Sequence, residues 1–155
     1  MPEVQVQISL YKNRCFQCGE PFWWVLWMRA ISPEPDNAMQ YWPGSIDEDD
    51  GVIQHFAMPV VVENPDAVHT AQRLLENLGQ KGRARQLVDR PARARGASYN
   101  ANQCPRCRHV ASWHDLDHLV IEAAHENRLF HLGPAPVSLR EWMRVIAAQH
   151  NVRGF

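Results

Sequence analysis

Long apolar runs are missing from this chain of 155 residues. The longest, Phe22–Met28, has seven residues, whereas a helix that crosses a bilayer needs about 18 or more. The opening stretch, MPEVQVQISLYK, also lacks the basic region followed by an apolar region that marks a secretory signal. We therefore expect a cytoplasmic protein without a membrane partner. In that compartment thiols stay reduced, and paired cysteines more often bind a metal than form disulfides.

Basic residues are missing from residues 30–72, a segment that holds eight acidic residues. Residues 73–108 show the opposite balance, with nine basic residues against only two acidic ones. Such a division is typical of a surface that faces a partner, although two such segments can also neutralise each other within the fold. The candidate partner-binding residues are Lys81, Arg83, Arg85, Arg90, Arg93 and Arg95 in the basic segment and Asp47, Glu48, Asp49 and Asp50 in the acidic loop.

Several catalytic motifs are also missing. The chain has no glycine-rich phosphate-binding loop and no serine in a glycine-flanked elbow. It has two lysines, Lys12 and Lys81, and neither follows an acidic residue in a strand at the spacing that metal-dependent nucleases use. These absences make an enzyme the less favoured interpretation.

Four cysteines are present, and they form two Cys-x-x-Cys pairs, CFQC at 15–18 and CPRC at 104–107, with 85 residues between them. Structural zinc takes four ligands in a tetrahedron and favours thiolates, and each such turn supplies two sulfurs on one side of a tight loop. Gly19 allows the backbone bend that usually follows the first pair, and Pro105 stiffens the second loop. A fold that brings the pairs together completes the ligand shell of one zinc ion.

CFQCG and CPRC, each at the end of a strand-like segment, resemble the two knuckles of a zinc ribbon. The resemblance covers roughly residues 4–30 and 98–122. It implies one structural zinc ion held by Cys15, Cys18, Cys104 and Cys107, in a single domain of residues 1–155 with residues 31–97 as an insertion. The second knuckle departs from the pattern, because Arg108 stands where a glycine often follows the last cysteine. Zinc ribbons bind nucleic acids, dock proteins and occur in enzymes, so the class implies a metal and not a function.

Other interpretations of the cysteines remain open. A redox pair of the thioredoxin kind lies within a strand–helix pattern, but GEPF after Cys18 starts no helix. The second pair lies just before residues that can form a helix, so redox chemistry is harder to dismiss there. His109, two residues after Cys107, is an alternative ligand in place of one cysteine. Four unrelated buried thiols would not explain the duplicated spacing.

Two strands are predicted around the first cysteine pair. Apolar residues alternate with polar ones in EVQVQISLYK at 3–12, the pattern of a half-buried strand. The aromatic and branched run in GEPFWWVLWMRAI at 19–31 predicts a second strand, so the first pair lies at the tip of a hairpin. Residues 32–51 predict a loop, and residues 51–63 predict a further strand in which Pro59 indicates an edge position or a break.

A helix is predicted over residues 64–79. Asn64 can cap it, Pro65 stands at the first helical position, and Gly79 provides the stop. The basic segment that follows predicts a short helix that ends before Pro91.

Two further helices are predicted in the last third of the chain. Residues 113–130 predict a helix, with a strand around residues 119–121 as the alternative. Residues 138–150 predict the last helix, which opens with the capping-box pair Ser138 and Glu141. The predicted fold class is therefore α+β, with a small antiparallel sheet, a split four-cysteine zinc ribbon and three to four helices.

Histidines cluster between residues 109 and 131, which hold five of the eight. In a helix, His114 and His118 share a face, and a catalytic metal site can use such a pair with one carboxylate and an open position. Asp115 stands, however, where the His-Glu-x-x-His motif has a glutamate. Two surface or packing histidines are the simpler interpretation.

The aromatic run Phe22, Trp23, Trp24 and Trp27 predicts core, with a base-stacking surface as the alternative. Because neighbours on a strand face opposite ways, Trp23 and Trp24 cannot both point into a one-sided core. One of them is covered by another element or exposed for binding.

The favoured interpretation is a small zinc-binding recognition protein of inhibitor, immunity or adaptor type. A surface with charges of both signs suits a complementary protein better than a polyanion, so we expect a protein partner. A nucleic-acid-binding zinc ribbon is the alternative, favoured where the basic segment and an exposed tryptophan line one groove. A metal-dependent hydrolase that uses His114 and His118 is the second alternative.

Overall fold

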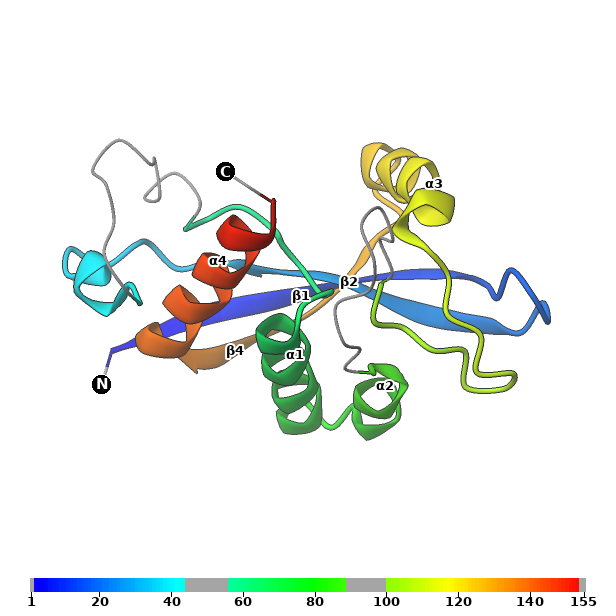
Figure 1. Cartoon of the computed structure of the whole chain (residues 1–155), viewed down its shortest axis with the longest axis horizontal. Helices are drawn as coiled ribbons and strands as arrows, with labels where there is room; N and C mark the ends of the chain where they lie inside the picture. Colours follow the sequence, from blue (N-terminus) through cyan, green and yellow to red (C-terminus); the bar gives the residue numbers. More distant parts are fainter. Residues whose placement is uncertain (1, 44–55, 89–99, 154–155) are drawn as a thin grey trace.

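A long antiparallel hairpin forms the axis of the molecule (Figure 1). A computed structural model describes residues 2–43, 56–88 and 100–153, with the backbone alone for His114 and for residues 150–153. Strand β1 (Glu3–Arg14) pairs with β2 (Pro21–Ala30) from the Arg14–Pro21 pair to the Val6–Ala30 pair. The first cysteine pair occupies the turn between the strands, as the alternating pattern of β1 and the aromatic run of β2 predicted.

Two edge strands complete a four-stranded sheet with the order β3-β2-β1-β4. Strand β3 (Val60–Val61) pairs antiparallel with β2, and Pro59 directly precedes it. Strand β4 (Phe130–Ser138) pairs antiparallel with β1. The strand expected within residues 51–63 is therefore confirmed as β3, and it lies at an edge, as Pro59 indicated.

The sequence did not predict β4, because its segment holds Gly133 and two prolines. Proline lacks a backbone N–H and is tolerated in sheets at edges, where one side of the strand has no neighbour to receive that bond. The ladder to β1 shifts register between Val6 and Ile8, opposite Gly133, whose φ is +105°. A Cβ at Gly133 would lie 3.1 Å from the carbonyl oxygen of Val6, so glycine is required by both space and backbone angle.

The helices follow the predicted order and differ from it mainly at their ends. A short 3-10 helix, η1 (Ala38–Tyr41), lies in the predicted loop over residues 32–51. Helix α1 (Pro65–Asn77) begins after Asn64, whose side-chain oxygen accepts a hydrogen bond from the Ala67 N–H at 2.9 Å. Helix α2 (Lys81–Gln86) is the short helix expected in the basic segment.

Helix α3 (Trp113–His125) is shorter than the predicted 113–130. Asn127, with φ of +55°, turns the chain out of the helix and into β4. Residues 119–121 are helical, so the alternative strand there is wrong. Helix α4 (Leu139–Arg153) begins after Ser138, whose hydroxyl oxygen accepts a hydrogen bond from the Glu141 N–H at 3.2 Å.

The Glu141 side chain connects α4 to α1 instead of closing the predicted capping box. Its carboxylate accepts a hydrogen bond from the Thr70 hydroxyl at 2.9 Å and forms an ion pair with Arg73. Both partners lie on α1. Since Ser138 and Glu141 still share one hydrogen bond, half of the capping box is present.

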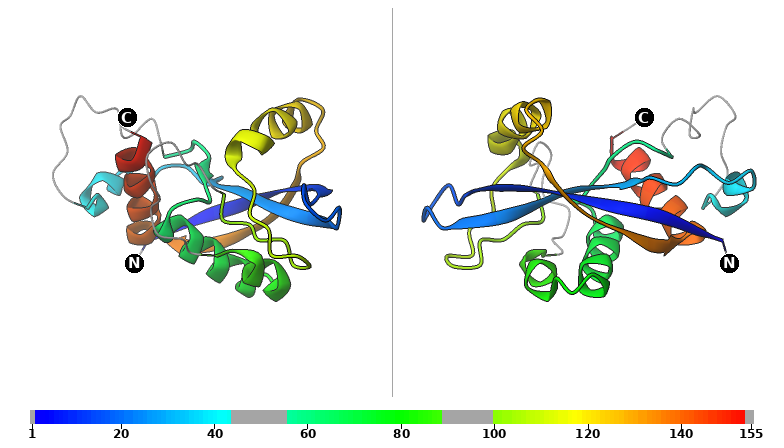
Figure 2. Two further views of the ribbon diagram at one scale, coloured as in Figure 1. Left: turned by 45° about the vertical axis from the view of Figure 1, so that its right-hand side comes forward. Right: turned by 180° about the vertical axis from the view of Figure 1, so that it is seen from behind.

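The sheet has a hydrophobic core on each of its faces. The first core joins Val6 and Ile8 of β1 to Leu74 of α1 and Trp142 of α4. The second core lies beside the cysteines and includes Tyr11, Cys15, Phe22, Trp24, Leu26, Cys104, Ala111, Trp113, Leu116, Val120 and Ala123. In both Figure 1 and Figure 2, α3 lies on the opposite side of the hairpin from α1 and α2.

A bulge in β2 assigns its tryptophans to the two cores. Ser9 of β1 is opposite Trp27, whereas Leu10 is opposite Val25, so Leu26 is an extra residue. Trp24 is buried in the second core, and Trp23 packs against the first core while remaining half-buried. The expectation that Trp23 and Trp24 face opposite ways is confirmed. Within the described residues, no helix is long and apolar enough to cross a membrane.

Candidate metal centre and neighbouring surfaces

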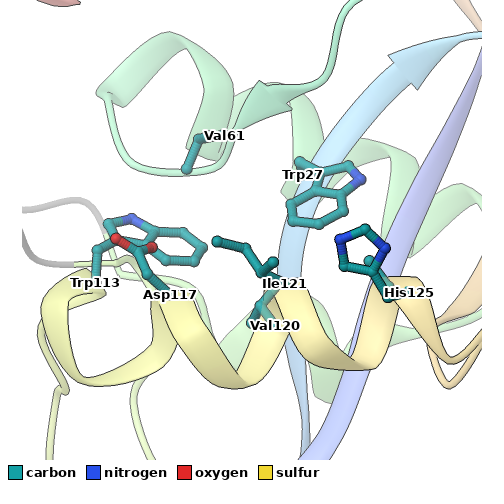
Figure 3. Close-up of a pocket in the computed structure, with 8 residues that line it drawn as sticks. Trp27, Val61, Trp113, Asp117, Val120, Ile121 and His125 are labelled. Atoms are coloured by element: carbon teal, nitrogen blue, oxygen red, sulfur yellow. The ribbon is translucent and has the colours of Figure 1, made fainter.

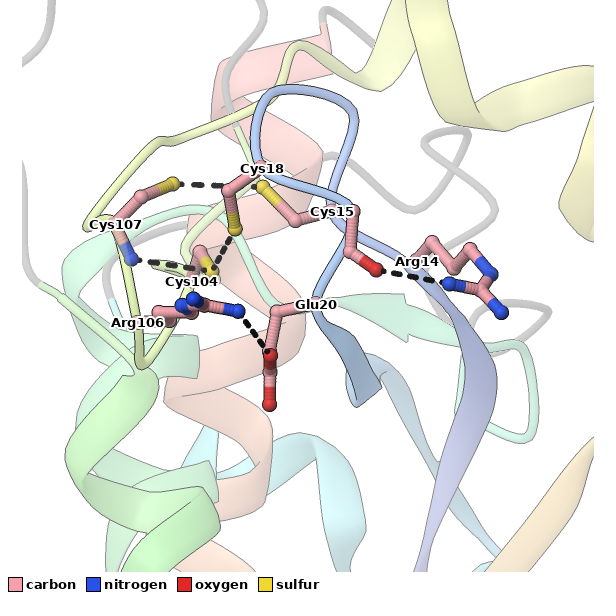
Figure 4. Close-up of polar contacts among 8 residues, drawn as sticks. Arg14, Cys15, Cys18, Glu20, Cys104, Arg106 and Cys107 are labelled. Carbon is pink, nitrogen blue, oxygen red and sulfur yellow. Dashed lines mark hydrogen bonds and ion pairs between the residues drawn. The ribbon is translucent and has the colours of Figure 1, made fainter.

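The four cysteine sulfurs lie together at the end of the hairpin (Figure 4). All four are within 4.8 Å of one another. Cys15 and Cys107 have their sulfurs 3.6 Å apart, and Cys18 and Cys104 have the same separation. A tetrahedral ion with zinc–sulfur bonds of about 2.3 Å needs sulfurs about 3.8 Å apart. A disulfide needs sulfurs about 2.05 Å apart, so these spacings fit a shared metal ion and not a disulfide.

The first knuckle is held by hydrogen bonds of its own backbone. The Cys15 N–H donates to the carbonyl of Glu20 at 2.8 Å, and the Gly19 N–H donates to the carbonyl of Cys15 at 3.0 Å. The Gln17 N–H points at the Cys15 sulfur at 3.4 Å. Gly19 has φ of +78°, the bend that the sequence assigned to it.

The second knuckle repeats this pattern in a different setting. The Cys104 N–H donates to the carbonyl of His109 at 2.9 Å, and the Arg108 N–H donates to the carbonyl of Cys104 at 2.9 Å. The Cys107 N–H points at the Cys104 sulfur at 3.5 Å. Arg108 has φ of +65° and therefore takes the conformation of Gly19 despite its side chain.

The second knuckle does not end a strand, which corrects the expectation drawn from the zinc ribbon. Residues 100–112 form none of the named strands, although Asn102 forms an isolated bridge with Leu87 and Ser112 also lies in a bridge position. Buried amide side chains hold this segment instead. Asn102, fully buried, accepts a hydrogen bond from the Val25 N–H at 2.8 Å and donates to the Val25 carbonyl at 2.7 Å. Its side chain thus forms the pair of hydrogen bonds with the backbone of β2 that a neighbouring strand would otherwise form.

Two further buried amides complete this network. Gln86 of α2 donates to Asn102 at 2.8 Å and to the carbonyl of Trp23 at 2.6 Å. Asn100 donates to the carbonyl of Ala111 at 2.7 Å. The sequence did not indicate these residues, because one amide at the end of a short helix and two in an irregular segment form no periodic pattern. The network fixes the second knuckle and α2 against β2.

Charged side chains around the sulfurs bridge the two knuckles. Arg106, from the second knuckle, forms an ion pair with Glu20, from the first, at 3.2 Å. Arg14 donates to the carbonyl of Gly19 at 3.3 Å. Both arginines are exposed, so their contribution to stability is small. Their positive charge does reduce the repulsion expected around four thiolates.

The sulfurs influence one another's ionisation. Burial raises the pKa of Cys104, but the backbone N–H groups of Cys107 and Arg106 and the thiols of the first pair outweigh it, so that its pKa falls from 9.0 to about 7. The backbone hydrogen bond from His109 lowers the pKa of Cys107. Burial and the three neighbouring sulfurs outweigh it and raise that pKa to about 12. Cys104 therefore ionises readily, and its negative charge opposes the ionisation of Cys107. A bound metal cation offsets this repulsion between thiolates. Metal binding in turn requires all four sulfurs in the deprotonated form.

This donor set suits a structural ion. Four sulfur ligands fill a tetrahedral shell and leave no position for water or substrate. Within the part of the chain that the structure describes, the group of possible metal ligands holds the four cysteines, and His109 is not part of it. The strand–helix context of a redox pair is absent at both knuckles, because β2 follows the first and α3 begins only at Trp113 after the second.

An apolar groove lies between α3 and the β2–β3 edge, on the same face as the second core (Figure 3). It encloses about 460 Å³. Trp27, Val61, Trp113, Val120, Ile121 and Ala124 form its apolar lining, and Asp117 and His125 lie along the same helix. Ile121 is 59 % exposed although it is a large aliphatic residue. The sequence did not indicate this groove, because its lining comes from three segments that are far apart along the chain.

The predicted partner-binding residues are only partly described. Lys81 and Arg85 are exposed on α2, and Arg83 is half-buried. The remaining members, Arg90, Arg93, Arg95, Asp47, Glu48, Asp49 and Asp50, lie outside the described residues.

The predicted histidine pair lies on α3. His118 is exposed, whereas the side chain of His114 lies outside the described part. A second metal site there stays a prediction, as does the treatment of residues 31–97 as an insertion.

The chain matches no known family model, no curated protein and no solved structure.

Proposed function

We propose that this protein is a zinc-binding recognition protein that docks another protein. The zinc ion is structural: it joins the tip of the β1–β2 hairpin to the segment before α3, and its four thiolates leave no open position for catalysis. Docking uses the apolar groove. The observation that carries this role is the exposed Ile121 between two tryptophans, since exposed apolar surface in a polar rim marks interaction sites.

The chemistry of the groove specifies the partner. Trp27 and Trp113 offer large, stiff side chains of the kind enriched where binding energy concentrates. Asp117 lies one helical turn from Ile121, so a basic residue beside an apolar anchor gains an ion pair as the anchor enters the groove. We therefore expect a partner segment with one large apolar residue next to a lysine or arginine.

The zinc assignment is tested by metal content on protein purified without chelator. We expect one zinc ion per chain and four thiols that react with a thiol reagent only after chelation. Replacement of Cys18 by serine should lower the zinc content and expose the remaining thiols. A metal-free protein with four reactive thiols in the native state would overturn the assignment, and two ions per chain would direct attention to His114 and His118.

The docking proposal is tested by selection from a displayed peptide library. Zinc-loaded protein should enrich peptides that carry an aromatic or aliphatic residue beside a lysine or arginine. We expect the Ile121→Asp variant to bind the selected peptides at least about tenfold more weakly, since one desolvated anchor is worth roughly 1–2 kcal/mol or more. Ile31→Asp is the matched control, because Ile31 is also exposed, at 46 %, and does not line the groove.

Charge reversal makes this test specific. Asp117→Lys should shift the selection toward peptides with glutamate or aspartate at the same position. Equal losses in Ile121→Asp and Ile31→Asp, or no enrichment at all, would contradict the docking role. Self-association that Ile121→Asp abolishes would identify a second copy of the chain as the occupant instead.

A further inference from the structure

Two aromatic rings meet on the other face of the sheet, near the metal centre. The rings of Trp23 on β2 and Phe130 at the start of β4 have centroids 5.4 Å apart and planes 51° apart. Phe130 is 49 % exposed, so much of its ring surface is open. Trp23 packs against the first core, which places this pair on the face opposite the apolar groove.

Two cations lie beside the same rings. The Lys12 ammonium nitrogen is 5.9 Å from the ring centre of Trp23, and the Arg83 guanidinium carbon is 5.8 Å from it. Lys12 is the cross-strand neighbour of Trp23, and Arg83 comes from α2. Among the described residues, no carboxylate pairs with either cation. Arg83 also donates a hydrogen bond to the side-chain oxygen of Gln80, a neutral group. Among the described residues, the partners of the two cations are therefore the tryptophan ring and this amide, both weaker partners than an anion.

The surrounding structure holds this arrangement in place. Gln86 of α2 donates to the carbonyl of Trp23 and to Asn102, so the helix that carries Arg83 is tied to β2. Lys12 and Trp23 are each within three residues of the Arg14–Pro21 pair that closes the hairpin beside the cysteines. Fixed side chains lose less conformational entropy on binding, so the arrangement is pre-organised.

We propose that this cation–aromatic face, made of Lys12, Trp23, Arg83 and Phe130, binds single-stranded nucleic acid. Lys12 and Arg83 contact consecutive phosphates, and a base stacks on the open ring of Phe130. Stacking tolerates any base, because every base has a π face, so we expect little sequence preference. An acidic peptide would satisfy the two cations but would leave the ring of Phe130 without a planar partner. This proposal is independent of the docking groove, because the two surfaces lie on opposite faces of the sheet.

The test uses the full zinc-loaded chain and fluorescein-labelled single strands of about 20 nucleotides, oligo-dT and a mixed sequence, followed by anisotropy. Binding should weaken from about 50 mM to 200 mM salt, because phosphate contacts release counterions. Two cations contribute a slope of about −1.4 in log affinity against log salt concentration for a single strand. The Lys12→Glu/Arg83→Glu double variant should lose at least tenfold in affinity and show a shallower slope.

Phe130→Ala tests the stacking contact separately. It should weaken binding about five- to a hundred-fold, the range that one stacked base provides, and leave the salt slope unchanged. Arg29→Glu is the matched control for charge, because Arg29 is exposed on β2 six residues from Trp23 and pairs with Gln7 of β1, away from this face. Phe16→Ala is the control for an exposed aromatic residue, since the Phe16 ring packs at a tilt against Trp24 of the second core. Both controls should bind as the wild type does.

Each remaining outcome overturns the proposal. Wild-type protein that binds neither strand at about 50 mM salt excludes the role. Equal affinity for duplex and single strands, or for polyglutamate, would mean that the cations attract any polyanion and that stacking contributes nothing. Arg29→Glu changes the net charge by two units and the double variant changes it by four. A loss in log affinity for Arg29→Glu of half that in the double variant would therefore mean that overall charge, and not this face, determines affinity.

Discussion

Arg108 occupies a backbone conformation that a residue with a Cβ adopts only at a cost. Its φ of +65° repeats that of Gly19 at the same place in the first knuckle. For an L-residue the left-handed region costs about 1–2 kcal/mol. After this bend the chain returns, and the carbonyl of His109 accepts a hydrogen bond from the Cys104 N–H at 2.9 Å. The strained residue therefore helps to close the second knuckle.

Arg108→Gly should stabilise the zinc-loaded protein. Glycine removes the left-handed strain from the folded state, and this effect is larger than the conformational entropy that glycine adds to the unfolded chain. We therefore expect the free energy of unfolding to rise by about 0.5–1 kcal/mol. That gain corresponds to a rise in melting temperature of about 1–4 °C for a chain of this length. Arg108→Ala is the control and should show no such rise, because alanine keeps the Cβ. Calorimetry on both variants provides the comparison, and a lower melting temperature for the glycine variant would refute the strain argument.

The ionisation of Cys104 makes a second prediction at this scale. Its folded pKa, about 7, is below the ordinary 9.0, so its contribution to folding is present above the unfolded value and is lost as pH falls through about 7. Cys107, with its pKa raised to about 12, favours the folded state while protonated and loses that contribution at high pH. In metal-free protein, thiolate absorbance should therefore show one step near pH 7, which Cys104→Ser removes. Four thiols that titrate together near 9 would contradict this ordering.

Single residues show where sequence reasoning succeeded and where it could not. The sequence indicated the four cysteines, because a repeated Cys-x-x-Cys unit carries its chemistry in its spacing. It also indicated the departure at Arg108, whose positive φ became visible only in the structure. Asn102 escaped notice, because a buried amide is defined by its surroundings and not by its neighbours in the chain.

At the scale of elements, β4 depends on one glycine. Gly133 sits where the ladder between β1 and β4 shifts register, with φ of +105°. A Cβ there would meet the carbonyl oxygen of Val6 at 3.1 Å and the nitrogen of Ala135 at 3.2 Å. These atoms belong to the backbone and cannot move aside without disturbing the sheet.

Gly133→Ala should therefore lower the free energy of unfolding, by about 1–3 kcal/mol for the strained backbone alone. The matched control is Gly82→Ala in α2, where an added Cβ meets no atom within 4 Å. Alanine is the better helix former, so that variant should be unchanged or more stable by up to about 1 kcal/mol. Urea denaturation of the two variants measures the difference, and equal midpoints would show that β4 tolerates the bulge without glycine.

Asn102→Ala tests the amide contact that covers β2. The substitution leaves the N–H and carbonyl of Val25 without partners in a buried position, which costs about 2–4 kcal/mol. We also expect weaker zinc binding, measured by competition with a chromophoric chelator, because Asn102 positions the second knuckle. Asn77→Ala, at the exposed end of α1, is the control for a lost amide and should alter neither quantity. A stable Asn102→Ala variant with normal zinc affinity would show that the amide network does not position the metal site.

Regular elements were predictable to the extent that their pattern was local. The alternation in β1, the cap of α1 and the start of α4 at Ser138 each fall within one segment, and the structure confirms all three. Strand β4 was not predictable, because β1 recruits a proline-containing segment that has no strand pattern of its own. The end of α3 was not predictable either, because Asn127 adopts a left-handed conformation that no local sequence pattern indicates.

At the scale of the whole molecule, the proposed metal ion would support the two cores differently. The second core contains Cys15 and Cys104, whereas the first core is built from β1, β2, α1 and α4 without a cysteine. Loss of the ion should therefore loosen the second core first. Regions with independent packing can open separately below the free energy of global unfolding.

Hydrogen exchange with and without chelator measures this difference. After zinc removal we expect faster amide exchange in residues 15–24 and 104–125, with α1 little changed. The Cys18→Ser variant should reproduce this pattern without chelator. Uniform acceleration through both cores would mean that the ion supports the entire fold, and no acceleration would mean that packing alone holds the hairpin tip.

The distance between the two knuckles along the chain has a consequence in time. A ribosome that adds about 5–20 residues per second needs roughly 4–17 s to cover the 85 residues from one pair to the other. During that interval the first pair offers only half of a coordination shell. Under the proposed zinc assignment, metal capture is therefore a late event in synthesis, and a nascent chain that stops before Cys104 carries two thiols without their partners. A filled site would thus report that synthesis has passed Cys107 and that the two knuckles have come together.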